Sequence, residues 1–203
     1  MRPLPSLVVL LSIVLTLTGA VPTSGQDSPS LFVLIETELG RIEVAMDMER
    51  APATANNFLE YVRAGHFTDG QFHRTVTLDN QPDNEILIEV IQASVNREFR
   101  EDGFDPIALE RTNVTGLKHL DGTISMARGG ADSATSSFFI CVGDQPSLDF
   151  GGMRNADGQG FAAFGRVTHG MEVVRKIQQS PAEGQSLTPP VRILSMMVVG
   201  KNY

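Results

Sequence analysis

Two apolar runs near residue 31 show the alternation of β-strands. The runs Leu31–Glu36 and Arg41–Asp47 are separated by the turn residues 37–40, which predicts a β-hairpin. From Ile42 to Met46 every second residue is apolar, so the second strand is expected to bury one face.

The period becomes helical over Pro52–Ala64. Apolar residues recur there at intervals of three and four between Ala55 and Val62, and Gly65 follows the end of the segment. A proline in the first turn also favours a helix start. The same stripe predicts a second helix over Met171–Gln178.

Six further short runs are rich in apolar or β-branched residues and are bounded by turn formers, which predicts strands. They are Phe72–Leu78, Glu85–Ala93, Gly122–Ala127, Ser137–Val142, Phe161–Val167 and Val191–Val199. Eight strands with two helices do not alternate as in a parallel α/β sheet. The pattern predicts one mainly β domain over residues 31–203, an antiparallel barrel or sandwich whose open ends are covered by the helices.

The first 25 residues have the pattern of an export signal. A positive start is followed by an apolar run over Leu7–Leu17 and by small residues, so cleavage is expected after Ala20 or, as a second choice, after Gly25. Residues 26–30 form a short polar tether. We therefore expect an exported protein, periplasmic or secreted, which would stay at a membrane only if the apolar segment is left uncleaved.

Charge and cysteine content exclude several classes of function. With 24 acidic and 16 basic residues the formal charge is −8, which argues against a nucleic-acid partner. The single cysteine, Cys141, excludes an internal disulfide and a multi-cysteine zinc site, and its apolar strand predicts a packed core thiol. The four histidines lack the paired spacing of a metal site, so a metal site is not expected.

Two other motifs carry weaker functional signals. Ser136 and Ser137 lack the glycine-flanked turn of a nucleophilic serine, which leaves a hydrolase as a remote alternative. Asn113-Val114-Thr115 matches a glycosylation acceptor, which would matter only in a glycosylating host.

A series of short motifs stands out by its order. The motifs are Phe72-His73-Arg74, Ile91-Gln92, Gly122-Thr-Ile-Ser-Met-Ala127, Ser136-Ser-Phe-Phe-Ile-Cys141, Leu148-Asp149 and Phe161-Ala-Ala-Phe-Gly-Arg-Val167. In this order and spacing, residues 31–200 resemble the cyclophilin family of peptidyl-prolyl cis–trans isomerases. The resemblance implies a closed eight-stranded antiparallel β-barrel capped by two α-helices, which agrees with the element count above.

The resemblance also implies an activity, rotation about the peptide bond that precedes proline. Amide resonance sets a barrier of about 18–20 kcal/mol, and no covalent bond is broken and no proton transferred. The implied enzyme needs no cofactor or metal, takes proline-containing polypeptides as partners and assists the folding of exported proteins. A monomer is expected, because a closed barrel of this size can be stable alone.

By resemblance, Arg74 matches the catalytic arginine, whose guanidinium stays charged and presents a rigid fork of donors. Gln92 matches the glutamine that orients substrate and arginine, and Phe139 the aromatic floor of the proline pocket. The full set of implied substrate-binding residues is Val90, Ile91, Gln92, Ala127, Arg128, Ser137, Phe139, Leu148 and Phe161.

The chain departs from the family pattern at five pocket positions. Glu89 stands where Phe is usual, Val90 where Met is common and Ser137 where Gln is common; Ser147 falls where many members have a Trp, and Phe161 where many have a His. A carboxylate at Glu89 is expected to make the pocket less apolar. These changes keep open a second hypothesis, a catalytically weak proline-peptide binding module or holdase.

The stretch between Arg74 and Gln92 holds 17 residues, about ten more than the family pattern needs. The insertion, within residues 75–87, is richest in turn formers over Thr77–Glu85 and predicts a protruding hairpin at the rim of the cleft. It is either a tolerated surface insertion or a segment that gates substrate or contacts a partner.

Overall fold

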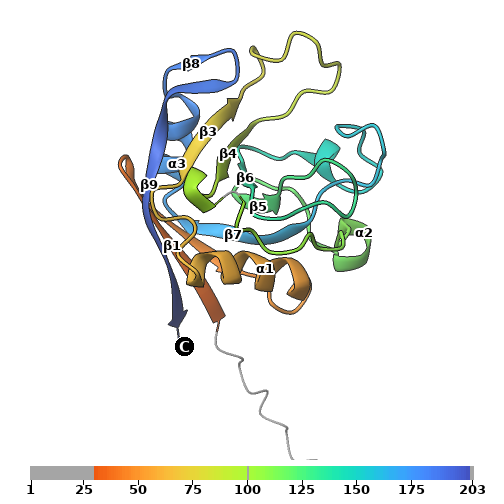
Figure 1. Ribbon diagram of the computed structural model, residues 1–203. Coiled ribbons are helices and arrows are strands. Elements are labelled where there is room, and N and C mark those ends of the chain that lie inside the picture. Colours follow the sequence, from red (N-terminus) through yellow and green to blue (C-terminus); the bar gives the residue numbers. More distant parts are fainter. Residues whose placement is uncertain (1–29, 100, 202–203) are drawn as a thin grey trace, which may run out of the picture.

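The fold is a single antiparallel sheet that closes on itself, in a computed structural model that describes residues 30–99 and 101–201. Around the ring the strands follow the order β1-β2-β7-β5-β6-β4-β3-β9, and β9 pairs back with β1 (Figure 1). Their bounds are β1 Ser30–Thr37, β2 Gly40–Met46, β3 Gln71–Val76, β4 Val90–Ser94, β5 Thr123–Met126, β6 Phe138–Cys141, β7 Ala163–His169 and β9 Ser186–Lys201. The predicted closed eight-stranded antiparallel barrel is confirmed.

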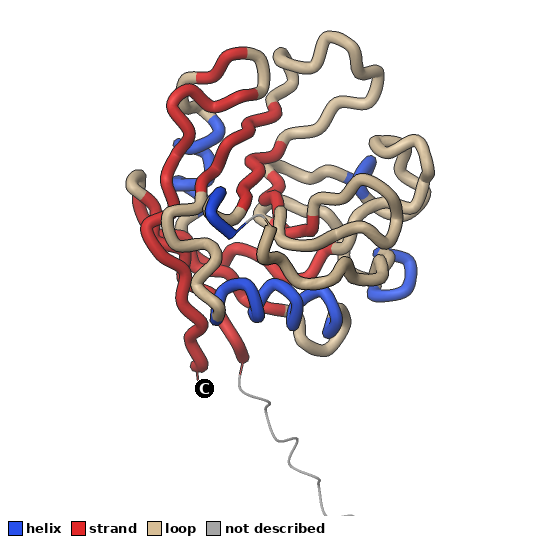
Figure 2. Tube along the Cα trace, in the orientation of Figure 1, coloured by secondary structure: helices blue, strands red, loops and turns tan. Residues whose placement is uncertain are grey.

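Two of the helices were predicted and two short elements were not. Helix α1 (Pro52–Arg63) packs against β7 and β9, and α3 (Met171–Gln178) packs against β2, β3 and β4, on different sides of the barrel (Figure 2). The four-residue helix α2 (Thr112–Thr115) and the two-residue strand β8 (Ala182–Glu183), which pairs only with β9, are too short to leave a periodic signal.

Helix α1 receives its N-terminal cap from a distant part of the chain. Its N-cap residue, Ala51, has no side-chain acceptor. The carboxylate of Glu110 instead accepts the backbone N–H groups of Ala53 (3.1 Å) and Thr54 (2.7 Å). A negative charge at this end of a helix is also favoured by the helix dipole, so the loop that carries Glu110 is held against α1.

The barrel interior is filled by aromatic rings around Phe58 of α1. Its ring centroid lies 5.4 Å from that of Phe67 and 5.2 Å from those of Phe138 and Phe164. All four side chains are fully buried. The apolar stripe of α1 therefore closes one end of the barrel by packing onto strands from different parts of the sequence.

Strands β4 and β6 bury both of their faces. Their inward side chains, Ile91, Phe138 and Ile140, belong to the barrel core, and their outward side chains, Val90, Phe139 and Cys141, form a second apolar cluster with Val76, Ile88 and Leu148. The alternation expected along residues 137–141 is confirmed. Cys141 is a packed thiol as predicted, and burial raises its pKa.

The insertion between β3 and β4 forms a long loop over residues 77–89, not a hairpin with paired strands of its own (Figure 1). The strand predicted to begin at Glu85 begins at Val90. Before it, the side chain of Gln81 forms the hydrogen bonds to the backbone of Ile88 that a neighbouring strand would otherwise form. The buried amide of Gln81 donates to the carbonyls of Thr77 (2.7 Å) and Ile88 (2.8 Å) and accepts the N–H of Ile88 (3.3 Å).

The predicted signal segment, residues 1–25, and nearly all of the tether lie outside the described residues. Within residues 30–99 and 101–201, no helix has the length and apolar character needed to cross a bilayer.

Phe58→Ala is expected to lower the free energy of unfolding by about 3–5 kcal/mol, because it removes the ring that joins α1 to three core aromatics. Urea denaturation measures the loss. Val114→Ala, at a position 81% exposed, should change stability by less than about 0.5 kcal/mol. A loss below about 1 kcal/mol for Phe58→Ala would show that the barrel end does not depend on this cluster.

Candidate functional site

A pocket of about 250 Å³ lies on the outer face of β3, β4 and β6. It is lined by Arg74, Ile88, Val90, Gln92, Ala127, Arg128, Phe139, Leu148, Arg154, Asn155, Ala156 and Phe161. The structure thus brings together eight of the ten side chains singled out in the sequence: Arg74, Val90, Gln92, Ala127, Arg128, Phe139, Leu148 and Phe161.

The other two, Ile91 and Ser137, do not line the pocket. Ile91 is fully buried in the barrel interior, because side chains alternate along β4 and its neighbours Val90 and Gln92 face outward. Ser137 stands one residue before β6, and its backbone carbonyl accepts the N–H of Ala127 at 2.9 Å. The side chain of Ile91 is therefore not available to a substrate, whereas substrate contact at the half-buried Ser137 stays a prediction.

The expected carboxylate in the pocket is also corrected. Glu89 does not line the pocket; its carboxylate accepts a hydrogen bond from the Gln178 amide at the end of α3, 3.2 Å away. The residues on either side, Ile88 and Val90, line the pocket instead. The long loop therefore adds an apolar wall through Ile88, a residue that the sequence analysis missed.

The floor of the pocket is an aromatic slot. Phe139 is 5% exposed and meets the ring of Phe161 edge-on, with centroids 5.5 Å apart and planes at 87°. The guanidinium of Arg128 lies over the Phe161 ring at 5.0 Å, an arrangement that a cation–π interaction favours. With Leu148 buried beside them, these rings leave a narrow apolar space suited to a small ring.

A buried polar chain supports Phe139 from behind. The His119 ring stacks on it with centroids 6.0 Å apart, and the two His119 ring nitrogens lie 2.8 Å from an Asp149 carboxylate oxygen and 2.9 Å from the Ser125 hydroxyl. These contacts have the order of a hydrolytic triad. Ser125 is fully buried, however, so its hydroxyl has no access to a substrate and the chain braces the pocket floor.

Hydrogen bonding holds the carboxylate of Asp149 in its charged form. Burial acts to raise the pKa of Asp149, but hydrogen bonds from His119 and attraction to the charges of His119 and Lys118 outweigh it, so the pKa is lowered overall. The Lys118 ammonium lies 3.4 Å from this carboxylate.

Arg74 is held between two amide side chains. Its Nη1 donates to Gln92 Oε1 at 2.9 Å, while its Nε and Nη2 donate to Gln185 Oε1 at 2.9 and 2.6 Å. Two of the five N–H donors of the guanidinium remain for a ligand. Burial and then the nearby charge of Arg154 lower the pKa of Arg74.

Gln185 connects Arg74 to the inserted loop. The residue precedes β9, and its amide donates to the carbonyl of Asn80 at 3.1 Å. The amide of Asn80 donates in turn to the carbonyls of Thr75 (3.1 Å) and Gly184 (3.2 Å). Sequence reasoning missed Gln185 because it is 111 residues from Arg74 and no local motif marks it.

Two arginines from the opposite rim complete the pocket wall. Arg128 forms a two-pronged pair with Asp157 at 2.7 and 2.9 Å, and these hydrogen bonds lower the pKa of Asp157 to about 2. Arg154 donates from Nη1 to the carbonyl of Ile86 in the inserted loop, 2.5 Å away. Arg154, with Asn155 and Ala156, was missed because the irregular loop after β6 carries no periodic pattern.

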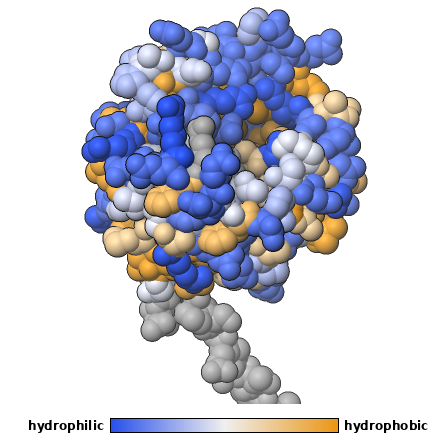
Figure 3. Space-filling view, in the orientation of Figure 1, coloured by the Kyte–Doolittle hydropathy of each residue, from blue (hydrophilic) through white to orange (hydrophobic). Residues whose placement is uncertain are grey.

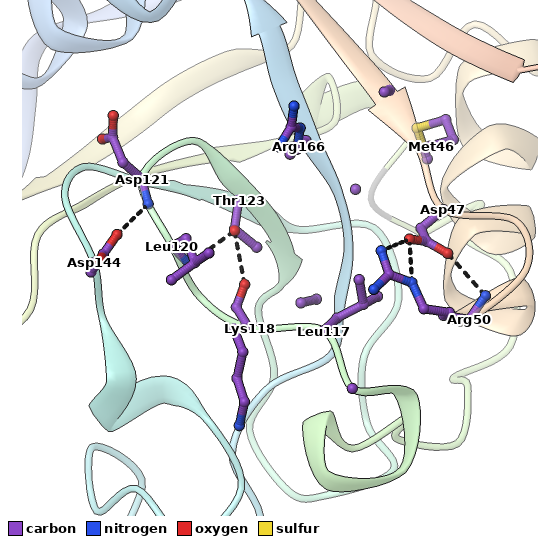
Figure 4. Close-up of a pocket in the computed structure, with 14 residues that line it drawn as sticks. Met46, Asp47, Arg50, Leu117, Lys118, Leu120, Asp121, Thr123, Asp144 and Arg166 are labelled. Atoms are coloured by element: carbon purple, nitrogen blue, oxygen red, sulfur yellow. Dashed lines mark hydrogen bonds and ion pairs between the residues drawn. The ribbon is translucent and has the colours of Figure 1, made fainter.

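A larger cavity of about 570 Å³ lies elsewhere, over β2, β5 and β7 (Figure 4). Two contacts join charged residues of its lining: Arg50 donates to Asp47 (Nε–Oδ2 2.8 Å), and Asp144 accepts the backbone N–H of Asp121 at 2.9 Å (Figure 4). It contains no aromatic ring and none of the predicted site residues. We therefore place the functional site in the smaller pocket.

The smaller pocket offers hydrogen-bond donors beside an apolar floor. Its lining holds no carboxylate, thiol or imidazole that could act as nucleophile or base. Within residues 30–99 and 101–201, no three His, Cys, Asp or Glu side chains gather closely enough to hold a metal ion. The arrangement suits binding and reshaping of a substrate rather than bond cleavage.

Comparison with known proteins agrees with this chemistry. Residues 32–198 match the family described as "Cyclophilin type peptidyl-prolyl cis-trans isomerase/CLD". The chain is 39% identical to peptidyl-prolyl cis-trans isomerase A of Dickeya dadantii over 171 residues, which cover 84% of this chain and 82% of the relative. It is 35% identical to peptidyl-prolyl cis-trans isomerase B of Escherichia coli over 149 residues, which cover 72% and 83%.

The fold also matches solved structures. A cyclophilin-type peptidyl-prolyl cis-trans isomerase of Cryptosporidium parvum, crystallised in the presence of the dipeptide Ala-Pro, superposes with a TM-score of 0.67 at 18% identity. The match covers 84% of this chain and 99% of that one, and at this identity it supports the fold alone.

Asp149→Ala is expected to destabilise the protein at pH 7 by about 1–3 kcal/mol, because it leaves Nδ1 of the buried His119 ring without a partner. The Asp149 carboxyl has a lowered pKa in the folded state, so its contribution is present above its unfolded pKa of about 3.9 and is lost as pH falls below that value. Urea denaturation measures the free energy of unfolding of both proteins. The difference between Asp149→Ala and wild type should become smaller between pH 7 and pH 3. The exposed Asp105→Ala serves as control, and an Asp149→Ala difference that stays constant down to pH 3 would contradict the assignment.

Proposed function

The chain belongs to the cyclophilin-type peptidyl-prolyl cis-trans isomerases, and from that premise we propose that its smaller pocket accelerates rotation about X-Pro bonds in exported proteins. The observation that carries the proposal is the placement of Arg74. Its guanidinium is fixed by Gln92 and Gln185 at the edge of an apolar slot floored by Phe139.

The chemistry of prolyl rotation explains why this geometry is effective. As the amide twists, its nitrogen becomes pyramidal and gains a lone pair that the planar amide does not offer. A hydrogen bond from Arg74 to that lone pair exists only near the transition state, and such bonds raise the rate rather than only the affinity. Because Arg74 is already positioned, little reorganisation is needed when the bond forms.

The apolar slot holds the proline ring in place while the preceding part of the amide rotates. We assign the proline ring to the space above Phe139, between Leu148 and Phe161. Ile88 and Val90 close the wall on the side of the inserted loop. The carboxylate of Glu89 lies away from the slot, at Gln178 of α3, so the slot stays apolar, which supports an active isomerase over the alternative of a weak binding module or holdase.

We also propose that the enzyme is a monomer. The face in Figure 3 is mostly hydrophilic, and its apolar residues lie in separate patches. The exposed large apolar side chains are scattered: Leu78 lies in the inserted loop, Val114 in α2 and Met153 in the loop after β6. Small, separate patches are usual on monomeric proteins.

Export is proposed from the N-terminal pattern of residues 1–25. Outside the cytoplasm, unfolded chains must reach their native prolyl isomers, and an uncatalysed exchange takes tens to hundreds of seconds. Proline-containing segments of newly exported proteins are therefore the proposed substrates.

Arg74→Ala is expected to lower kcat/KM for a proline-limited peptide by about 10²–10³-fold, because it removes the donor that acts in the transition state. A protease-coupled or NMR exchange assay on the mature domain measures the rate. Arg166→Ala removes the same charge from the larger cavity and should keep the wild-type rate. Equal acceleration by Arg74→Ala and wild type would disprove the role of Arg74. If the wild type does not exceed the spontaneous rate, the isomerase proposal fails and the alternative of a binding module is favoured.

Intact-mass analysis of the protein recovered outside the cytoplasm is expected to show loss of residues 1–20, or of residues 1–25. The mass of the full 203-residue chain in that fraction would contradict cleavage. The same spectrum tests Asn113, since a glycan adds a mass that disappears in Asn113→Gln.

A further inference from the structure

The pocket carries positive charge in a protein that is acidic overall. The formal charge of the chain is −8, yet the charged side chains that line the pocket are three arginines, Arg74, Arg128 and Arg154. No aspartate or glutamate lines it. The local charge therefore opposes the overall charge of the protein.

Only one of these arginines is paired with a carboxylate. Arg128 has its two-pronged pair with Asp157. Arg74 binds two neutral amides and Arg154 a neutral carbonyl, and neither forms a salt bridge with any residue of the described part of the chain. Two uncompensated guanidinium groups thus share a pocket of about 250 Å³.

Arg154 is held in place by both rims of the pocket. Its backbone N–H donates to the carbonyl of Ser147 at 3.2 Å, within a tight turn in which a Cβ on Gly152 would lie 2.4 Å from the same carbonyl oxygen. On the other rim, Nη1 donates to Ile86 in the inserted loop. This leaves Nε and Nη2, a rigid fork, without a partner in the described residues.

A guanidinium fork of this kind matches a carboxylate. Two parallel N–H···O bonds to one carboxylate give both energy and direction, which an ammonium or a single amide does not. The pocket is smaller than the roughly 300–1,000 Å³ typical of small-molecule sites, so it can take a proline ring and one neighbouring side chain. The free fork and the absence of lining carboxylates favour an acidic neighbour.

We propose that the enzyme selects proline segments in which an aspartate or glutamate directly precedes or follows the proline, and that Arg154 is the specificity-determining residue that binds this carboxylate. This inference rests on the proposed function of the pocket. Arg74 then donates to the rotating amide, while Arg154 binds the carboxylate of the acidic neighbour. The two guanidinium groups therefore contact different parts of the substrate.

The test compares peptides that differ only in the residue next to proline. One series places Glu, Gln or Lys before proline and a second places them after it, and kcat/KM is measured for wild type, Arg154→Gln, Arg154→Lys and the control Arg166→Gln. Wild type should prefer Glu over Gln by about five-fold or more in at least one series, at low ionic strength. The preference should shrink in about 1 M salt, which screens charges beyond roughly 3 Å.

Arg154→Gln should bring the ratio of kcat/KM for the Glu peptide to kcat/KM for the Gln peptide to about one. Arg154→Lys, which keeps the charge but not the fork, should retain part of the preference, and Arg166→Gln should retain all of it. Absence of a Glu preference in both series, or its survival in Arg154→Gln, overturns the proposal.

Failure of the proposed function would look different. In that case the wild type does not accelerate even the Gln peptide above the spontaneous rate. Binding of fluorescent Glu and Gln peptides, measured by anisotropy for wild type and Arg154→Gln, then decides the charge preference independently of catalysis. Equal affinity of wild type for both peptides would overturn the role of Arg154.

Discussion

The alternation of side chains along β4 and β6 is the constraint on which both the core and the pocket depend. Each of these strands has one face in the barrel interior and the other in the apolar cluster around Phe139. Since the period of a strand is two residues, the register that buries Phe138 and Ile140 also presents Phe139 outward. Stability of the barrel and shape of the proline slot are therefore fixed by the same backbone.

The polar part of the site depends on contacts between distant segments. Arg74 is oriented by Gln185, which is held by Asn80 of the inserted loop, and Arg154 contacts the other end of that loop at Ile86. The insertion thus braces both arginines that lack a carboxylate partner. A segment that could be read as a tolerated surface addition is a structural part of the pocket.

The sequence predicted what local periodicity and ordered motifs encode. Strand alternation and the helical stripes predicted both longer helices and a barrel or sandwich, and the resemblance predicted the closed barrel and eight pocket residues. Ile91 and Glu89 were placed in the pocket by resemblance, position by position, although the period of two along this strand already separates Ile91 from Val90 and Gln92. Gln185 and Arg154 could not be found, because their contacts join segments that no local pattern relates.

The pairing of β1 with β9 makes the first and last strands of the domain neighbours. Barrel closure therefore joins segments about 160 residues apart, which gives a topology of high contact order. The conformational entropy of this long loop is lost when β1 and β9 pair. Until β9 is in place, β1 and β3 are unprotected sheet edges, open to pairing with other chains. A catalyst of slow folding steps is thus itself a protein whose barrel cannot close until its last strand is available.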